Sequence, residues 1–172
     1  MQTKKERRAR IVEILRTTDG AVTGAQLSDK TGVSRQAVVN DMAILRAAGE
    51  PIVGSPQGYR YAGAPQGGVT VVIACKHDRE GSGEELRCFV DNDVTVLDVV
   101  VEHQLYGEVR ANLMVRSRGD VERYLTALKE LDVQPLSSLT GGVHLHHVWA
   151  DHPVSIEAAK RGLAALGFLL QD

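Results

Sequence analysis

The spacing of hydrophobic positions changes character near residue 65, which divides the chain into two parts. Before that point most apolar side chains recur at helical spacing, and a Pro/Gly turn near the end separates two short apolar segments. This pattern predicts three helices and two short strands, at residues 4–17, 24–31, 34–48, 52–54 and 59–62. We therefore expect a small helical unit that ends in a β-hairpin.

The third predicted helix has one apolar and one polar face. Val38, Met42 and Leu45 share the apolar face, whereas the other face carries forked and amide side chains that can pair with base edges in a DNA groove. A helix, a turn and a capped helix of this kind, followed by a hairpin, resemble a winged helix-turn-helix. The predicted DNA contacts are Ser34, Arg35, Gln36, Asn40 and, from the hairpin, Arg60.

The distribution of charge favours DNA binding over the alternative, a helical module that docks other proteins. Residues 1–65 carry 10 Lys and Arg against 6 Asp and Glu, whereas residues 66–172 carry 10 against 16. A basic first part suits a polyanion, and an acidic second part suits a different task. The joint is predicted at the Gly/Pro-rich segment 63–68, which gives domains at 1–64 and 65–172.

The second part alternates between strand and helix patterns. Runs of β-branched residues predict four strands, at 69–75, 94–102, 108–115 and 143–149. Amphipathic segments predict three helices, at 84–91, 118–131 and 153–170. The expected fold class is α+β, with a mainly antiparallel sheet covered by helices on one side.

Composition narrows the class of protein. With 43% hydrophobic residues the chain can bury a core, and it has no apolar run of the roughly 20 residues that a membrane span requires. The basic N-terminus lacks the apolar segment of a secretory signal, so we expect a cytoplasmic protein without a membrane partner. Cys75 and Cys88 form no Cys-x-x-Cys pair and are expected to be thiols.

Three of the six histidines lie within the segment 144–147, on a predicted strand. Residues two apart on a strand point to the same side, so His144 and His146 project together and can share a metal ion. One strand supplies two ligands, and further donors are available in His77 and in Glu84 or Glu85. Cys75 is a rival ligand, but at the end of an apolar strand we expect it to be a small buried side chain. The alternative is a pair of hydrogen-bonded surface histidines.

Four segments, in this order behind a winged helix-turn-helix, resemble one family across essentially the whole chain. They are ACKHD at 74–78, EEL followed by VDN within 84–92, VEHQLYGEV at 101–109 and LTGGVHLHHV at 139–148. The family is the niacin-responsive repressors of the NiaR type, whose second part is the 3H domain. The resemblance implies an HPr-like α/β sandwich, a homodimer that binds operator DNA, and nicotinic acid or a related pyridine carboxylate as corepressor for genes of NAD synthesis or niacin uptake.

The resemblance also implies roles for individual residues. The metal ligands would be His77, Glu85, His144 and His146, which selects Glu85 over Glu84. The third histidine motif falls on His103, and His103 and Tyr106 are the predicted effector contacts. The chain departs from the family pattern at Gln104-Leu105, where Pro-Val is usual, and at His147, where a non-histidine residue is usual. The first departure bears on the effector and leaves the ligand set unchanged.

Two other functions remain open on the residues alone. The divalent transition metal (zinc, nickel, iron or manganese) could itself be the signal of a metal-dependent repressor. A metalloenzyme with an accessory DNA-binding domain is the third reading, because an open metal position beside Glu84 could activate water. No nucleophile motif, phosphate loop or second acid/base pair accompanies the site, so we expect a regulator and not an enzyme.

Overall fold

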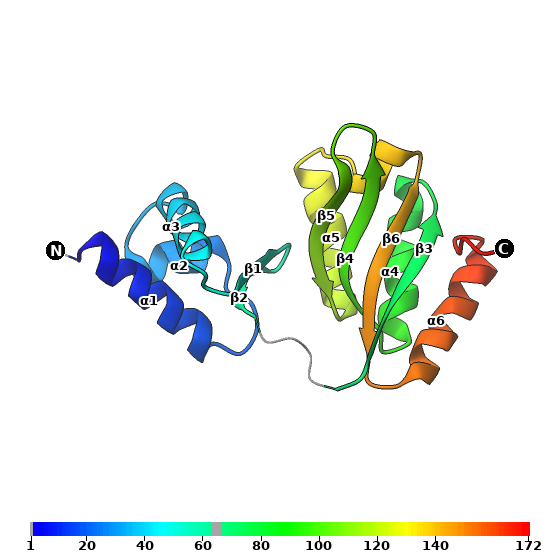
Figure 1. The fold of residues 1–172 in the computed structure, drawn as a ribbon, viewed down its shortest axis with the longest axis horizontal. Coiled ribbons are helices and arrows are strands. Elements are labelled where there is room, and N and C mark those ends of the chain that lie inside the picture. Colours follow the sequence, from blue (N-terminus) through cyan, green and yellow to red (C-terminus); the bar gives the residue numbers. More distant parts are fainter. Residues whose placement is uncertain (1, 63–66) are drawn as a thin grey trace. The chain divides into compact units, whose positions relative to one another are not determined.

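A computed structural model describes residues 2–62 and 67–172, and Figure 1 shows its elements. The chain forms two compact units, Met1–Ala64 and Pro65–Asp172. Residues 63–66 of the predicted joint lie outside the described residues. Each unit has a hydrophobic core of its own.

The first unit consists of three helices and a hairpin: α1 (Lys4–Thr17), α2 (Gly24–Thr31), α3 (Arg35–Ala47), β1 (Ile52–Ser55) and β2 (Gly58–Tyr61). Side-chain caps begin each helix, since Thr3, Thr23 and Ser34 accept hydrogen bonds from backbone N–H groups of the first turn. The helices end within one or two residues of the expected positions. Capping residues and apolar spacing therefore account for the local structure of this unit.

The core of the first unit joins all three helices to the hairpin. Ile11, Leu27 and Val38 are fully buried and Met42 nearly so, as the apolar spacing predicts. The hairpin is fixed to the turn before α2, because Val22 and Tyr59 exchange two backbone hydrogen bonds of 2.7 and 2.8 Å. This arrangement is a winged helix-turn-helix.

The second unit is a four-stranded sheet with the order β3-β6-β4-β5, and every neighbouring pair is antiparallel. The strands are β3 (Val69–Lys76), β4 (Thr95–His103), β5 (Gly107–Val115) and β6 (Val143–Ala150). Three helices, α4 (Ser82–Asp91), α5 (Arg118–Glu130) and α6 (Pro153–Leu166), supply the other layer. Their side chains share one core with the sheet, and the α+β class is as expected.

The sheet therefore has one covered face and one open face. Along β6 the residues alternate, so His144, His146 and Val148 are buried beneath the helices while Leu145 is 36% exposed on the other side. Two short 3₁₀ segments, Arg79–Gly81 (η1) and Leu136–Thr140 (η2), were not anticipated. They lie at the end of the sheet where β3 finishes and β6 begins, and η2 packs against β4 and β6.

The last helix is shorter than the apolar pattern predicts, and the expected range 153–170 is wrong at its end. The helix stops at Leu166, because Gly167 adopts a left-handed conformation (φ 77°) that reverses the chain. The following residues run along the edge of β3, where the Lys76 N–H donates to the Phe168 carbonyl at 2.8 Å and the Leu170 N–H donates to the Ala74 carbonyl at 2.9 Å. The tail thus protects the edge of the sheet.

Among the described residues, no helix combines the length and the apolar character that crossing a membrane requires.

We expect removal of residues 168–172 to lower the free energy of unfolding of the second unit by about 2–4 kcal/mol, because it exposes the edge of β3 and unpacks two half-buried apolar side chains. Urea unfolding of the full chain measures this change. Removal of residues 171–172 alone is the control and should have little effect. Equal stability of both truncated chains would show that the tail does not support the sheet.

A candidate metal centre

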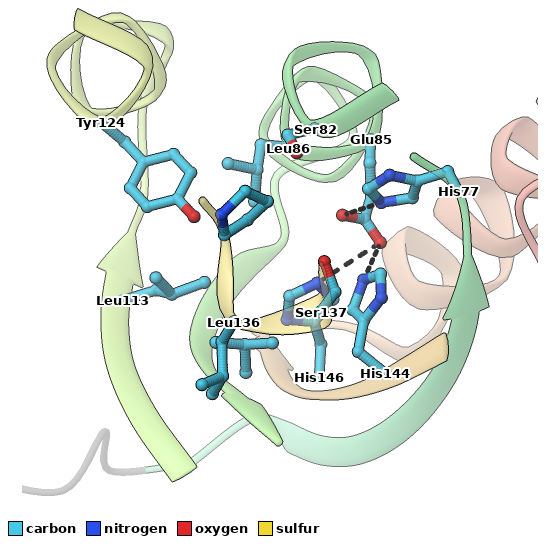
Figure 2. Close-up of a pocket in the computed structure, with 12 residues that line it drawn as sticks. His77, Ser82, Glu85, Leu86, Leu113, Tyr124, Leu136, Ser137, His144 and His146 are labelled. Carbon is cyan, nitrogen blue, oxygen red and sulfur yellow. Dashed lines mark hydrogen bonds and ion pairs between the residues drawn. The ribbon is translucent and has the colours of Figure 1, made fainter. Parts of the chain in front are cut away.

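Three of the predicted ligands contact the fourth, Glu85, beneath α4. His77 follows β3, His144 and His146 project from β6, and Glu85 descends from the first helical turn of α4 (Figure 2). All four side chains are only 2–3% exposed. The neighbouring Glu84 points to solvent, so the helix presents only one of its two candidate carboxylates to the site.

The Glu85 carboxylate occupies the centre of this group. Its Oε2 lies 2.7 Å from His77 Nε2, and its Oε1 lies 2.9 Å from His144 Nε2 and 3.3 Å from His146 Nε2. The His144 ring makes edge contacts with both other rings, and its centroid lies 4.9 Å from that of His77 and 4.8 Å from that of His146. A carboxylate and three imidazoles therefore share one buried volume.

Backbone carbonyls determine which ring nitrogen faces Glu85. The Nδ1 atoms of His77, His144 and His146 lie 2.6, 2.8 and 2.6 Å from carbonyl oxygens of Asp78, Gly142 and Asp98. A carbonyl oxygen can only accept, so each Nδ1 must carry a proton and donate it. Each neutral imidazole then presents the lone pair of Nε2 to the site, which is the arrangement found around metal-bound histidines.

The site has more acceptors than donors unless a cation is added. In neutral rings three Nε2 lone pairs face two carboxylate oxygens, and every one of these atoms is an acceptor. His146 Nε2 shows the consequence, since it is buried and has no hydrogen-bond partner within the described structure. Either protons or a metal ion can balance this group, and three nitrogens plus one oxygen suit a divalent transition metal.

Without a metal the charges in the site favour protonated histidines. Burial lowers the pKa of His77 and of His146, but their contacts with Glu85 outweigh it, so both pKa values are raised above the ordinary 6.5. For Glu85, burial raises the pKa, but the charge of His146 and the hydrogen bonds with His144 and His77 lower it well below the ordinary 4.5. The cluster is therefore held together by proton-mediated ion pairs.

A β-bulge on the central strand positions His146. The pairing of β4 with β6 shifts between Val96 and Val100, which frees the Asp98 carbonyl to accept from His146 Nδ1. The buried Asp98 carboxylate turns to the other side of the sheet and accepts from the His147 backbone N–H at 2.9 Å and from His147 Nδ1 at 2.9 Å. His147 is thus a partner of Asp98 and not a fourth histidine of the centre.

The C-terminal tail and a glycine position His77. The Phe168 ring packs against the His77 ring with centroids 4.8 Å apart. Gly142 has φ 92°, and a Cβ atom there would lie 2.2 Å from the His77 carbonyl oxygen. Both contacts depend on residues far from His77 in sequence, so local patterns could not have indicated them.

A small cavity opens beside the four ligands (Figure 2). It has a volume of about 20 Å³, enough for one water molecule and too small for an aromatic ring. Three of its lining residues carry hydroxyl groups, namely Ser82, Tyr124 and Ser137. None of them is among the site residues predicted from the sequence. The sequence indicates such a role only by placing a polar group at an inward-facing position, as for Tyr124 on the apolar stripe of α5.

A larger open pocket of about 600 Å³ lies next to this cavity and shares His77 and Ser137 with it. Its lining carries two basic residues, Lys76 and Arg79, and two acidic ones, Asp78 and Glu80, and the η2 segment forms one side. The wall that the two spaces share therefore includes one candidate ligand and one residue of η2.

The predicted effector contacts lie elsewhere. His103 and Tyr106 stack on each other at the turn between β4 and β5, with ring centroids 5.2 Å apart, and Tyr106 is 74% exposed. Neither residue lines the small cavity or the larger pocket.

The predicted DNA contacts lie on α3 and β2 and differ in exposure. Arg35, Gln36 and Asn40 are exposed on α3, and Gln36 Nε2 donates to Asn40 Oδ1 at 3.2 Å. Ser34 caps the same helix, so its hydroxyl is already engaged with the Ala37 N–H. Arg60 is half-buried on β2.

Cys75 lies close to the Glu85 carboxylate and the His144 ring. Its Sγ, a Glu85 oxygen and a His144 ring nitrogen all lie within 4.8 Å of one another. Burial raises the pKa of this thiol, and the Glu85 carboxylate raises it further. The expected small buried side chain is thus also a potential ligand.

Comparisons with known proteins match both units. Residues 7–60 match a helix-turn-helix domain, and residues 70–172 match the 3H domain. The chain is 40% identical over 169 residues to the "Probable transcription repressor NiaR" of Thermotoga maritima, which covers 98% of this chain and 96% of that protein. It is 36% identical to the "Transcription repressor NadR" of Bacillus subtilis, over 96% and 94% of the two chains. Both relatives are regulators, which agrees with the expectation that this chain is not an enzyme.

Gly142 offers a test of how the backbone supports the site. We expect Gly142→Ala to lower the free energy of unfolding by about 1–3 kcal/mol more than a control glycine substitution, because the new methyl group collides with the His77 carbonyl. Gly141→Ala is the matched control, since Gly141 also has a positive φ (62°) but has open space around it, and it should cost about 1 kcal/mol. Urea unfolding distinguishes them, and equal losses would contradict the proposed contact.

The pKa shifts predict an unusual pH dependence for the metal-free protein. The raised pKa values of His77 and His146 contribute stability that is fully present below pH 6.5 and is lost as the pH rises through their folded-state values. The lowered pKa of Glu85 contributes stability that is present above pH 4.5 and is lost at lower pH. We expect chelator-treated protein to have its highest Tm between these two pH values. A Tm that climbs steadily from pH 6 to about pH 8 would contradict this assignment.

Proposed function

The chain belongs to the family of NiaR-type transcription repressors, and from this premise we propose that it is a metal-containing repressor whose affinity for operator DNA depends on a small pyridine carboxylate. Nicotinic acid is the proposed corepressor, and genes of NAD synthesis or niacin uptake are the proposed targets. The observation that carries the proposal is the set of three Nε2 lone pairs aimed at one buried carboxylate, each fixed by a carbonyl behind the ring.

The proposed ligands are His77, Glu85, His144 and His146. Three nitrogens and one oxygen leave a divalent ion with one or two free positions, which a carboxylate or a pyridine nitrogen can occupy. The metal would supply a positive anchor for the effector. The identity of the ion, among zinc, nickel, iron and manganese, follows from geometry and supply.

The small cavity must enlarge before it can accept a pyridine ring. The wall between it and the larger pocket includes Ser137 of η2, so a shift of η2 would join the two spaces. The hydroxyls of Ser82, Tyr124 and Ser137 would then be available to hydrogen-bond the effector. The effector role of His103 and Tyr106 stays a prediction, since neither residue lines this cavity.

A structural change in the 3H unit on effector binding would alter DNA binding through a homodimer. In the proposed mechanism the effector favours one placement of the two winged helices, which matches half-sites about one DNA turn apart. The contacts would come from Arg35, Gln36, Asn40 and Arg60, with Ser34 capping the reading helix. A coupling of about 1–3 kcal/mol would change operator affinity by about 5- to 150-fold. The protein would act in the cytoplasm, where its DNA is.

The metal could instead be the signal, and this second candidate rests on the same ligands. A metal-dependent repressor would bind DNA once the ion is loaded, with no organic effector. The two candidates differ only in whether the metal-loaded protein still needs the carboxylate.

Substitution of the two strand ligands tests the metal and the effector together. We expect elemental analysis to find about one transition-metal ion per purified chain, and calorimetry to detect nicotinic acid binding only to the metal-loaded protein. The variant His144→Ala/His146→Ala should lose both, whereas His152→Ala, at an exposed histidine, should keep both. Wild-type protein that contains no metal, or that binds nicotinic acid equally well after chelation, would contradict the proposal.

Fluorescence anisotropy then measures the link to DNA. An operator selected from random sequences in the presence of metal and nicotinic acid serves as the probe. Nicotinic acid should strengthen its binding to the metal-loaded protein by the range given above. An effect of metal alone would favour the metal-dependent repressor, and no effect of either would exclude both candidates.

A further inference from the structure

The pairing of β3 with β6 places Cys75 beside the ligands of the proposed metal centre. In that register Cys75 lies directly opposite His144, and directly opposed residues of antiparallel strands project to the same face. His77, two residues further along, faces the same side and reaches Glu85. The two strands thus present a Cys-x-His segment beside a His-x-His segment. Cys75 is fully buried where the two segments pair.

The sulfur is within the range of a shared metal ion. Three donor atoms that lie within 4.8 Å of one another surround a common point, and shifts of less than about 1 Å would give a metal there bonds of about 2.0–2.3 Å. An independent indication of a cation site is His146 Nε2, which is buried, lies 3.3 Å from the same carboxylate and has no hydrogen-bond partner among the described residues.

We propose that Cys75 is a further ligand of the metal centre, so that two overlapping donor sets share Glu85 and His144. One set adds His77 and His146 and offers nitrogen and oxygen, and the other adds Cys75 and offers sulfur as well. This inference rests on the proposed function only in requiring that the centre holds a metal. On coordination the thiol proton is released to water and the sulfur binds as a thiolate.

The consequence concerns which metals the protein selects. Thiolate favours soft and borderline ions such as cadmium and zinc, whereas manganese prefers oxygen and nitrogen. A centre with both sets can discriminate between ions by recruiting Cys75 or leaving it unbound. The pyridine carboxylate would then meet different free positions on different metals.

Cobalt substitution tests the sulfur ligand directly. Chelator-treated full-length wild-type protein is titrated with Co²⁺, and we expect visible ligand-field bands together with a near-ultraviolet sulfur-to-cobalt charge-transfer band. Cys75→Ser should keep the visible bands and lose the charge-transfer band. Cys88→Ser is the matched control and should keep both, because Cys88 donates to the Ala159 carbonyl at 3.6 Å and is absent from the donor group.

Metal affinities provide the second readout. Cys75→Ser should weaken Cd²⁺ binding by about tenfold or more and leave Mn²⁺ binding nearly unchanged. Cadmium-113 NMR of the unmodified protein reports sulfur ligation without any substitution, so the test does not depend on the variant folding.

The outcomes separate this inference from the proposed function. Bound Co²⁺ without a charge-transfer band in the wild-type protein, or a band that persists in Cys75→Ser, overturns the sulfur ligand and leaves the metal centre standing. A wild-type protein that binds neither Co²⁺ nor Cd²⁺ overturns both. A cadmium resonance in the range of nitrogen and oxygen ligation also overturns the role of Cys75.

Discussion

The second unit depends on one interaction, the contact of the Glu85 carboxylate with three buried imidazoles. A buried carboxylate is costly unless its charge is balanced, and here the balance can come only from protons on the rings or from a cation among them. Backbone carbonyls fix the orientation of the three rings, because each Nδ1 donates to a carbonyl oxygen and each Nε2 is directed at Glu85. The buried carboxylate therefore requires positive charge beside it, which protonated imidazoles or a bound metal ion can supply.

Several features of the fold serve that contact. The bulge at Asp98 releases a carbonyl for His146, Gly142 allows the chain to pass close to His77, and Phe168 closes over the His77 ring. These residues come from three separate segments of the chain, so the ligand geometry depends on the packing of the whole unit. The segment η2 completes the wall between the small cavity and the larger pocket.

The first unit is held together mainly by helix capping and apolar packing. Its helices start at capped residues and bury one apolar stripe each, which leaves the polar face of α3 exposed. The buried Asp41 accepts from Arg7, with Nε–Oδ2 at 2.6 Å, and so joins α3 to α1. That pairing removes one basic side chain from the surface that the charge pattern suggested for DNA.

Much of this protein was determined by local sequence. Alternation placed His144 and His146 on one side of a strand, and helical spacing with capping residues located the helices, because both periodicities are properties of single segments. The family resemblance, and not spacing, selected Glu85 over Glu84, and the structure turns only Glu85 inward. Tertiary structure alone decided that Cys75 faces His144, that Asp98 orients His146 and that the tail returns to β3, where the sequence predicted continued helix. Strand register and chain reversal bring together residues as far as 96 positions apart, such as Ala74 and Leu170, and no local pattern encodes such contacts.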